Sequence, residues 1–333
     1  MFFIPASMSH SIALYPIKFH PILKPKVWGG NRLSSVLKKQ PSDELIGESW
    51  ELSGVEGNIS VVSNGPLENR SLNELTRTFG ERLMGGRVAM QYKTEFPLLF
   101  KFIDARDDLS IQLHPDDKLA QKRHASFGKT EMWYIVDTSP DARLIIGFNS
   151  EMNEEKYLNH LSEGSLIDIL NSEKIQPGDV YFITPGTIHA IGGGTLLAEI
   201  QQTSDITYRI YDWDRPDANG KMRDLHTELA VEAIEYKQAN AKQQYEEKEN
   251  EAVLVCKSDF FETNKLKLTK PIVRQAGDLD SFRVYMCIDG KVTIEGDFAD
   301  VSVTKGETVL IPACIDRVKL KTKSATLLEV YIP

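Results

Sequence analysis

Short apolar runs separated by glycine and proline turns fill most of this 333-residue sequence. This pattern predicts extended strands and turns rather than long helices. Where apolar and polar residues alternate, as in residues 110–114, alternate side chains share one face of the strand. Repeated strands of this kind favour a β-sandwich or barrel. We therefore predict a mainly β protein, with a second all-β unit over residues 252–333.

Helical patterns interrupt the N-terminal part of the chain. Ser71 and Glu74 fit a capping box, and apolar residues recur at helical spacing as far as Met84. Residues 153–170 carry one apolar and one solvated face, with a division near Gly164. These patterns predict two helical inserts among the strands.

The length of the chain favours about two domains, at roughly 150 residues for each. A further helix is predicted over residues 225–240. The strongly polar composition of residues 237–250 indicates a linker. We therefore predict a domain with helical inserts over residues 14–240 and a β domain over residues 251–333.

Composition and charge exclude several classes of protein. Lysine and arginine number 39 against 48 aspartates and glutamates, for a net charge of -9, and no long basic tract is present. We therefore expect no nucleic-acid partner. Apolar runs fall well short of the roughly 20 residues that span a bilayer, so we expect no membrane partner either.

The cysteines and the N-terminal residues indicate the cellular compartment of the protein. Cys256, Cys287 and Cys314 are odd in number and have no C-x-x-C spacing, which excludes a disulfide framework. Residues 1–15 contain no lysine or arginine, the first being Lys18, and so lack the charged start of a secretion signal. We expect a cytoplasmic protein.

Residues of metal-ligand type occur on several predicted strands. Gln112 and His114 share one face of a strand, Glu131 begins a later strand, and His189 follows a Pro-Gly turn at residues 185–186. Two histidines and a carboxylate from neighbouring strands can hold one divalent metal and leave positions open for substrate. The competing interpretation is that these polar residues are unrelated to one another.

Two of these segments resemble the motifs of the cupin superfamily. Residues 178–189 are similar to the second cupin motif, Gly-x5-Pro-x-Gly-x2-His, with the proline displaced by one position to Pro185. The first motif departs further. Gln112 stands where the first histidine is expected, and Glu131 follows His114 by 17 residues rather than a few. The resemblance implies two cupin-like β-barrels (jelly rolls).

Longer motifs resemble the class I (type I) mannose-6-phosphate isomerases, in their short bacterial form. The similarity extends over most of residues 14–236. The matching runs, in order, are Gly47-Glu-Ser-Trp-Glu-Leu-Ser53, Ser110-Ile-Gln-Leu-His-Pro-Asp-Asp117, Gly128-Lys-Thr-Glu-Met-Trp-Tyr134, Pro185-Gly-Thr-Ile-His-Ala190 and Tyr208-Arg-Ile-Tyr-Asp-Trp213.

The resemblance implies a zinc enzyme, with one Zn²⁺ per chain, that interconverts mannose 6-phosphate and fructose 6-phosphate. It implies that the zinc ligands are His114, Glu131 and His189, with Gln112 as a weaker fourth. It also implies a catalytic role for Arg209. Such a reaction moves a proton between C1 and C2 through an enediol(ate), for which a metal acts as a Lewis acid.

Arg209 is also a candidate functional residue on grounds that do not depend on the family resemblance. An arginine that alternates into a barrel interior is expected to meet an anion. The alternative is a salt bridge to Asp212 or Asp214 at the rim. Glu199 lies on an otherwise apolar strand and is a candidate acid/base group. Its alternative is a buried ion pair with Arg209.

Lys129 and Ser110 are candidate substrate-binding residues. Lys129 lies two residues before Glu131 and could hold the substrate phosphate as a compact cation, together with Ser110. We expect Lys129 to be unburied, with a pKa too high for a base near neutral pH. The alternative is an exposed loop lysine without a role.

The C-terminal unit repeats the cupin spacing without its metal ligands. Residues 306–317 follow that spacing, but Cys314 stands at the second glycine and Arg317 at the histidine. This pattern predicts a degenerate cupin-like domain that has lost its metal site and packs against the first domain.

Two other classes of function remain open from the sequence. Two histidines and a carboxylate also describe the facial triad of an iron(II) oxygenase. A non-catalytic sugar-binding or regulatory cupin is the third possibility. Gln112, Lys129 and Arg209 favour the phosphosugar isomerase. The sequence leaves the oligomeric state undetermined.

Overall fold

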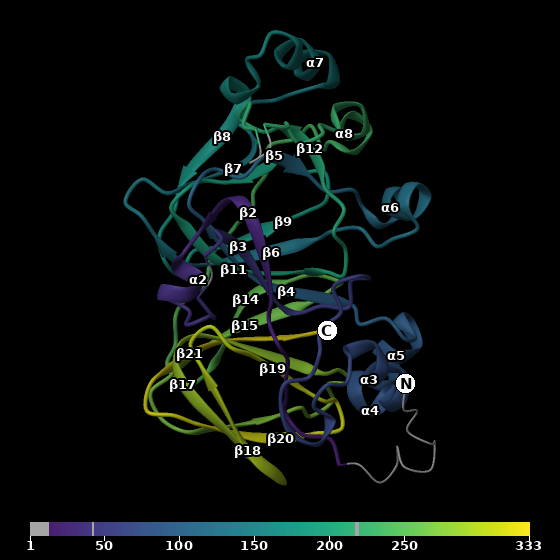
Figure 1. The fold of residues 1–333 in the computed structure, drawn as a ribbon, viewed down its shortest axis with the longest axis vertical. Helices are drawn as coiled ribbons and strands as arrows, with labels where there is room; N and C mark the ends of the chain where they lie inside the picture. The colour runs from purple at the N-terminus through teal and green to yellow at the C-terminus, as the bar shows by residue number, and fades with distance from the viewer. Residues whose placement is uncertain (1–12, 42, 217–219) are drawn as a thin grey trace.

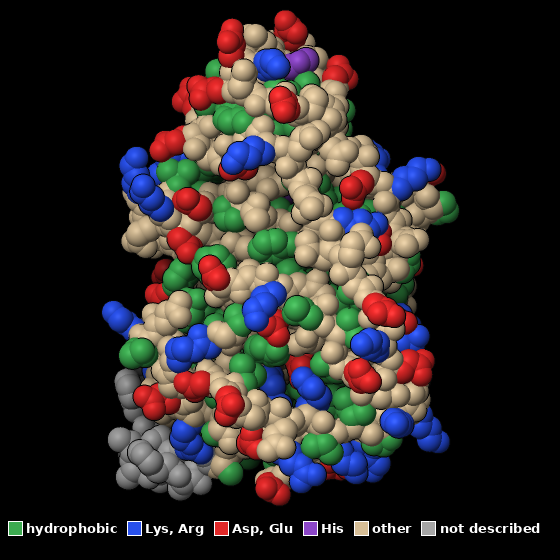
Figure 2. Space-filling model, turned by 180° about the vertical axis from the view of Figure 1, so that it is seen from behind, with side chains coloured by type: hydrophobic (Ala, Val, Ile, Leu, Met, Phe, Trp, Pro, Cys, Tyr) green, Lys and Arg blue, Asp and Glu red, His purple; other side chains and the backbone are tan. Residues whose placement is uncertain are grey.

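The structure is a computed structural model that describes residues 13–41, 43–216 and 220–333. The prediction about a secretion signal therefore falls largely outside the described residues. Within the described ranges, no helix is both long and apolar enough to cross a membrane. Figure 2 shows positive and negative side chains interspersed over the rear face of the molecule.

The N-terminal part of the described chain contains two antiparallel sheets (Figure 1). The larger has seven strands in the order β13-β9-β6-β11-β4-β2-β3, and the smaller has five in the order β12-β5-β10-β7-β8. The seven are β2 (Ile22–Gly30), β3 (Ile46–Leu52), β4 (Leu98–Ala105), β6 (Glu131–Thr138), β9 (Val180–Ile183), β11 (Thr195–Gln202) and β13 (Lys242–Gln243). The five are β5 (Ile111–Leu113), β7 (Arg143–Phe148), β8 (Leu170–Lys174), β10 (His189–Ile191) and β12 (Tyr208–Tyr211).

A nine-stranded sheet makes up the C-terminal part, and one of its strands comes from the start of the chain. The long strand β17 pairs with β19 and β21 along its first half and with β18 and β20 along its second. The nine are β1 (Ile17–Lys18), β14 (Ala252–Lys257), β15 (Glu262–Leu268), β16 (Ile272–Gln275), β17 (Arg283–Gly296), β18 (Phe298–Thr304), β19 (Thr308–Ile311), β20 (Arg317–Lys321) and β21 (Ala325–Tyr331).

The seven-stranded sheet is buried on both of its faces. Along β4, Phe100 and Phe102 belong to a core shared with the C-terminal part, whereas Ile103 belongs to a core shared with the five-stranded sheet. On β6, Met132 and Trp133 divide in the same way. Because strand side chains alternate between faces, one face of this sheet packs against the five-stranded sheet and the other packs against the C-terminal part. The sheet is therefore the middle layer of the molecule.

Helices cover the outside of these layers. Ser71 and Glu74 form the predicted capping box, which confirms the start of the first insert. The predicted continuous helix is two helices, because Gly80, at a φ of 44°, ends one and begins the next. The helices are α2 (Arg32–Ser35), η1 (Gly65–Leu67), α3 (Leu72–Phe79), α4 (Glu81–Met84), α5 (Gly86–Tyr92), α6 (Asp117–His124), α7 (Glu154–Ser162), η2 (Leu166–Ile169) and α8 (Thr227–Ala233).

The predicted helix over residues 225–240 is shorter in the structure. Helix α8 ends at Ala233, and Ile234 adopts extended backbone. The predicted linker then contains β13, which pairs with β9 at the edge of the seven-stranded sheet. The Glu235 N–H donates to the Gly186 carbonyl at 2.9 Å, and the Ala241 carbonyl accepts from Phe182 at 2.8 Å, so this segment bonds to residues around β9 instead of continuing the helix.

The two parts of the chain are joined by more than a linker. Ile17 of β1 pairs with Leu310 of β19, so the start of the described chain adds a strand to the C-terminal sheet. Helices α3 to α5 lie against the same C-terminal sheet, at the lower right of Figure 1. There Leu83 accepts a backbone hydrogen bond of 2.9 Å from Ala313.

We expect Ile17→Ala to destabilise the protein by about 2–5 kcal/mol, because Ile17 is fully buried in the core that joins the two parts. Urea unfolding measures the change. The control is Met90→Ala, at a side chain 79% exposed, which should alter stability by less than about 0.5 kcal/mol. Equal midpoints of urea unfolding for Ile17→Ala and the unsubstituted protein would contradict a hydrophobic core shared by the two parts.

Candidate metal centre and active-site cavity

His114, Glu131 and His189 meet between the two N-terminal sheets. His114 Nε2 lies 3.7 Å from one carboxylate oxygen of Glu131, and His189 Nε2 lies 3.6 Å from the other. All three potential ligand atoms lie within 4.8 Å of one another. Each side chain is at most 2% exposed. The structure thus brings together three of the four predicted metal ligands as one buried cluster.

Backbone geometry brings the two histidine-bearing segments together. Gly186 has a φ of 81°, and a side chain there would meet the carbonyl oxygen of Ala233 at 2.5 Å. Only glycine suits such a position. The Gly186 N–H donates to the His114 carbonyl at 2.9 Å, so the turn before His189 is tied directly to the other histidine.

Hydrogen bonds fix which nitrogen of each histidine is available. His114 Nδ1 lies 2.8 Å from the Ile206 carbonyl oxygen, and His189 Nδ1 lies 2.9 Å from the Thr187 carbonyl oxygen. A carbonyl oxygen only accepts, so both Nδ1 atoms carry the proton. Both Nε2 lone pairs therefore face Glu131, which is the arrangement that metal-ligating histidines adopt.

The cluster fits a divalent metal ion. His189 Nε2 and Glu131 Oε1 are buried without a hydrogen-bond partner, a costly state that a bound cation relieves. Ligand atoms about 2.1 Å from one ion lie roughly 3–4 Å apart, as these pairs do. Burial, then Lys129, lowers the pKa of His189 to about 4 and that of His114 well below its usual value. Both rings are therefore neutral, as metal ligation requires.

Lys129 is buried, and our expectation of an unburied lysine is wrong. Its side chain is 5% exposed. Its Nζ lies 2.9 Å from His114 Nε2 and also donates to Glu131. Two residues apart on an extended segment, Lys129 and Glu131 point to the same face, as the sequence predicts. The ammonium group therefore lies at the ligand cluster itself.

Strand register aligns the remaining predicted residues beside the cluster. Gln112 of β5 lies opposite His189 of β10 on one side and opposite Arg209 of β12 on the other. Its side-chain oxygen accepts a hydrogen bond from Ser110 at 3.0 Å. Arg209 Nε donates to the same Ser110 hydroxyl at 3.3 Å. These residues form a polar row that leads away from His189.

The alternative interpretation of Arg209, a rim salt bridge to Asp212 or Asp214, is not what the structure shows. Asp212 pairs with Arg215 and Arg223, and Asp214 accepts from Tyr211. Among the described residues, no carboxylate forms an ion pair with Arg209. Burial, then the nearby Arg223, lowers the pKa of Arg209 below its ordinary value. Its charge is thus left available for an anion.

Ser110, Gln112, Lys129 and Arg209 line one cavity of about 270 Å³ between the sheets, whereas the three potential metal ligands are not among its lining residues. Five cations and three carboxylates contribute to its wall, so its local charge opposes the net charge of the chain. The lining residues are Lys26, Trp28, Glu48, Lys101, Ile103, Leu109, Ser110, Gln112, Lys129, Trp133, Ile191, Glu199, Asp205, Thr207, Arg209 and Arg223. A local concentration of positive charge attracts anionic substrates.

Glu199 is paired with Lys101 rather than with Arg209. Lys101 Nζ donates to Glu199 Oε1 at 2.8 Å, and Trp133 Nε1 donates to Oε2 at 3.1 Å. Burial opposes ionisation of this carboxyl, but Lys101 outweighs it and lowers the pKa to about 2. Glu199 is therefore a buried, ionised carboxylate in the cavity wall.

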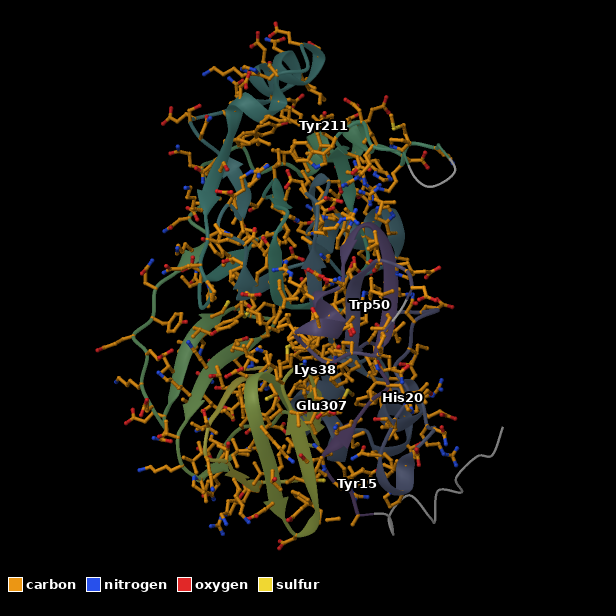
Figure 3. The ribbon with its side chains drawn as sticks, turned by 60° about the vertical axis from the view of Figure 1, so that its left-hand side comes forward. Tyr15, His20, Lys38, Trp50, Tyr211 and Glu307 are labelled. Atoms are coloured by element: carbon orange, nitrogen blue, oxygen red, sulfur yellow. The ribbon has the colours of Figure 1, made fainter. Side chains whose placement is uncertain are left out.

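Lys101 and Glu48 are cavity residues that sequence reasoning did not identify. Lys101 interrupts the apolar run of β4, which is a signal for a buried cation with a partner. Glu48 belongs to a motif that we matched to the family without giving the residue a role, and it accepts a hydrogen bond of 2.7 Å from Trp50. Lys101 lies 5.1 Å from the centre of the Trp50 ring (Trp50 is labelled in Figure 3).

The C-terminal part lacks a comparable cluster. Arg317, at the position of the second-motif histidine, is exposed at the start of β20. Cys314 is a free, exposed cysteine. Within the described residues, the only grouping of at least three potential metal ligands is the one in the N-terminal part.

Two family models match the chain. Residues 17–139 match the model described as phosphomannose isomerase type I, catalytic domain. Residues 250–332 match the model described as mannose-6-phosphate isomerase, cupin domain. The β-rich fold and the buried ligand cluster thus define a cupin-type protein with a candidate metal site.

Relatives and solved structures narrow the class further. The mannose-6-phosphate isomerase ManA of Bacillus subtilis is 41% identical over 66% of this chain and 68% of its own. That of Streptococcus mutans is 31% identical over 90% and 93%. A crystal structure of the Bacillus subtilis enzyme has a TM-score of 0.86 at 31% identity and covers 95% of this chain and 99% of its own. The chain belongs to the type I mannose-6-phosphate isomerase family.

We expect one divalent metal ion per purified chain, and loss of that ion in His189→Ala, because the imidazole supplies one of three buried ligand atoms. Elemental analysis of the dialysed protein measures the metal content per chain. The control is His160→Ala, a histidine that contacts Ser165 far from the cluster, which should keep the metal. Retention of a full equivalent by His189→Ala would contradict the site.

Proposed function

We propose that this protein is a zinc-dependent isomerase that interconverts mannose 6-phosphate and fructose 6-phosphate. The observation that supports it most directly is the buried His114, Glu131 and His189 cluster beside a cation-lined cavity, in a chain of this family. A ligand cluster alone would suit many metalloproteins. The adjacent cations favour an anionic substrate such as a phosphosugar.

His114, Glu131 and His189 would hold the zinc, with Gln112 as a weaker fourth ligand from the neighbouring strand. When bound, zinc supplies Lewis acidity that polarises a substrate oxygen. The chain contributes the rest. The two backbone carbonyls behind the imidazoles orient both rings, and burial excludes water from the cluster.

The isomerisation moves a proton between C1 and C2 of the sugar through an enediol(ate). Glu199 is the proposed acid/base group. Its ionised state, held by Lys101, leaves it able to accept the proton from one carbon and to return it to the other, although the same pairing lowers its pKa and weakens it as a base. Trp133 fixes the second carboxylate oxygen, so the orientation of the acceptor is set before substrate binds.

Arg209 is the proposed electrostatic catalyst. Its guanidinium is held by Ser110 and by the Asp224 carbonyl, and it lines the cavity without a carboxylate partner. A fixed cation in that place stabilises negative charge that develops on the substrate oxygens. The contact needs no reorganisation during the reaction, because hydrogen bonds already hold the side chain.

Lys129 and Ser110 are the proposed substrate-binding residues. Ser110 lies between Gln112 and Arg209, in hydrogen-bond contact with both. Lys129 lies at the ligand cluster, where its ammonium group can contact a substrate oxygen. Lys129 is the proposed phosphate-binding residue. Because Lys26, Lys101 and Arg223 also line the cavity and could bind the phosphate instead, kinetics of a Lys129 variant tests this assignment.

The domain assignment belongs to the same proposal. Residues 14–240 would form the catalytic cupin domain with its helical inserts, and residues 251–333 a degenerate cupin barrel that buries the back of the catalytic sheet. The shared hydrophobic core supports this division of roles. Three free cysteines are consistent with our expectation of a cytoplasmic enzyme.

We expect the purified protein to convert mannose 6-phosphate to fructose 6-phosphate, and to lose this activity on chelation, because the proposed Lewis acid is removed. A coupled assay before chelation, after chelation and after re-addition of Zn²⁺ measures it. An iron(II) oxygenase would consume oxygen instead, and a regulatory cupin would show binding without turnover. Unchanged turnover after metal removal would contradict the metal dependence.

We expect Arg209→Ala to keep its metal and its fold but to lose turnover by roughly 100- to 1,000-fold, as does removal of one preorganised electrostatic donor elsewhere. Arg106→Ala, at an exposed arginine paired with its neighbour Asp107, is the control and should retain turnover. Circular dichroism and elemental analysis verify both proteins. Near-normal turnover of Arg209→Ala would disprove the catalytic role.

We expect Lys129→Ala to raise the Michaelis constant and to weaken its dependence on salt, if Lys129 holds the phosphate, because a screened charge contact is lost. Steady-state kinetics at two ionic strengths measures both quantities. Lys118→Ala, an exposed lysine outside this cavity, is the control. A pure turnover defect with unchanged salt dependence would instead assign Lys129 to the chemistry at the ligand cluster.

A further inference from the structure

A second polar cavity lies where the N-terminal and C-terminal parts meet. Its volume is about 350 Å³. Residues 18–21, 23, 37–40, 51 and 63 form one side, and residues 304, 305, 307 and 308 of the C-terminal part form the other. Figure 3 shows Lys38 and Glu307 close together at this junction, with His20 beside them. We call it the junction cavity.

The charge of the junction cavity opposes that of the whole chain. Four lysines line it, against two glutamates, although the protein carries a net charge of -9. The lysines are Lys18, Lys38, Lys39 and Lys305, and the glutamates are Glu51 and Glu307. Three of the four lysines have a carboxylate partner, so a ligand would take the donors that these ion pairs leave unused.

Two of the lysines are only partly satisfied by the protein. Lys18 donates to Glu307 Oε1 at 2.5 Å and to the Ser302 carbonyl at 3.3 Å. Lys39 donates to Glu51 Oε2 at 2.7 Å and to the Gly306 carbonyl. An ammonium group has three N–H donors. Each of these lysines therefore has one donor left for an acceptor within the cavity.

A buried hydroxyl in the same wall also lacks a partner. Thr308 is 7% exposed, and its Oγ1 forms no hydrogen bond in the described structure. Buried polar groups usually have a partner, and each exception calls for one. Lys38 is exposed near the opening, where Lys305 forms an ion pair of 3.2 Å with the exposed Asp289. Donors from several elements thus converge on one space.

We propose that the junction cavity binds the phosphate group of a small molecule, as free phosphate or as a phosphate monoester. A tetrahedral oxyanion presents acceptors in several directions. It can therefore take the spare donors of Lys18 and Lys39 and the hydroxyl of Thr308, which come from three different elements.

This site is separate from the active-site cavity, although one strand borders both. On β3, Glu48 lines the active-site cavity, and Glu51 lines the junction cavity. The two cavities share no lining residue. Substitutions at the opening of the junction cavity therefore leave the proposed catalytic residues untouched.

Equilibrium dialysis with inorganic phosphate at constant ionic strength tests the proposal. The holoenzyme should bind two phosphates per chain, one in each cavity. The double variant Lys38→Glu with Lys305→Glu should bind one, with its turnover near normal, because neither side chain belongs to the catalytic machinery. The control double variant, Lys270→Glu with Lys323→Glu, makes the same charge change at exposed lysines elsewhere and should still bind two.

Lys129→Ala separates this proposal from the proposed function, because Lys129 is the proposed phosphate-binding residue of the active-site cavity. If that variant also binds two phosphates, Lys129 does not hold the second phosphate, but the junction site stands as long as Lys38→Glu with Lys305→Glu removes one. Equal phosphate binding by the junction double variant and the unsubstituted protein would overturn the junction site. Repeating the dialysis with methyl phosphate distinguishes the ligand sources: binding shows that the cavity accepts a monoester, and failure restricts it to free phosphate.

Discussion

Burial of the seven-stranded sheet on both faces is the constraint on which the rest of the structure depends. One face packs against the C-terminal part through Phe100 and Phe102, and the other carries Lys101, Glu131 and Glu199 toward the five-stranded sheet. Without the C-terminal part, the first face would expose a large apolar surface. The C-terminal unit therefore supports the site from behind, although it contributes no residue to the ligand cluster.

The site places charged groups among buried side chains, and each group has a physical reason to remain charged or neutral. Lys101 keeps Glu199 ionised, since their attraction exceeds the cost of burying both. Burial, then Lys129, keeps His114 and His189 neutral. A carboxylate in a proton-accepting state and imidazoles in a ligating state thus lie on facing sheets. Arg209 completes the arrangement, as a cation that no carboxylate neutralises within the described chain.

Much of the fold could be predicted from local patterns. The alternation over residues 110–114 placed Gln112 in the row beside His189, and the capping box at Ser71 and Glu74 formed as expected. Patterns failed where a distant partner decided the outcome. After Ala233 the chain leaves the helix and Glu235 hydrogen-bonds to the distant Gly186, and Lys129 is buried because its segment meets His114.

The sequence by itself determined which residue types are available and which of them share a face: two histidines and a glutamate at strand positions, and an arginine on an apolar strand. Only the tertiary structure decided the pairings among charged groups. Lys101 and Glu199 are 98 residues apart in the chain, and they meet because β4 and β11 pair in a register that sets them opposite each other. That register depends on packing at both faces of the sheet, and no local pattern specifies it.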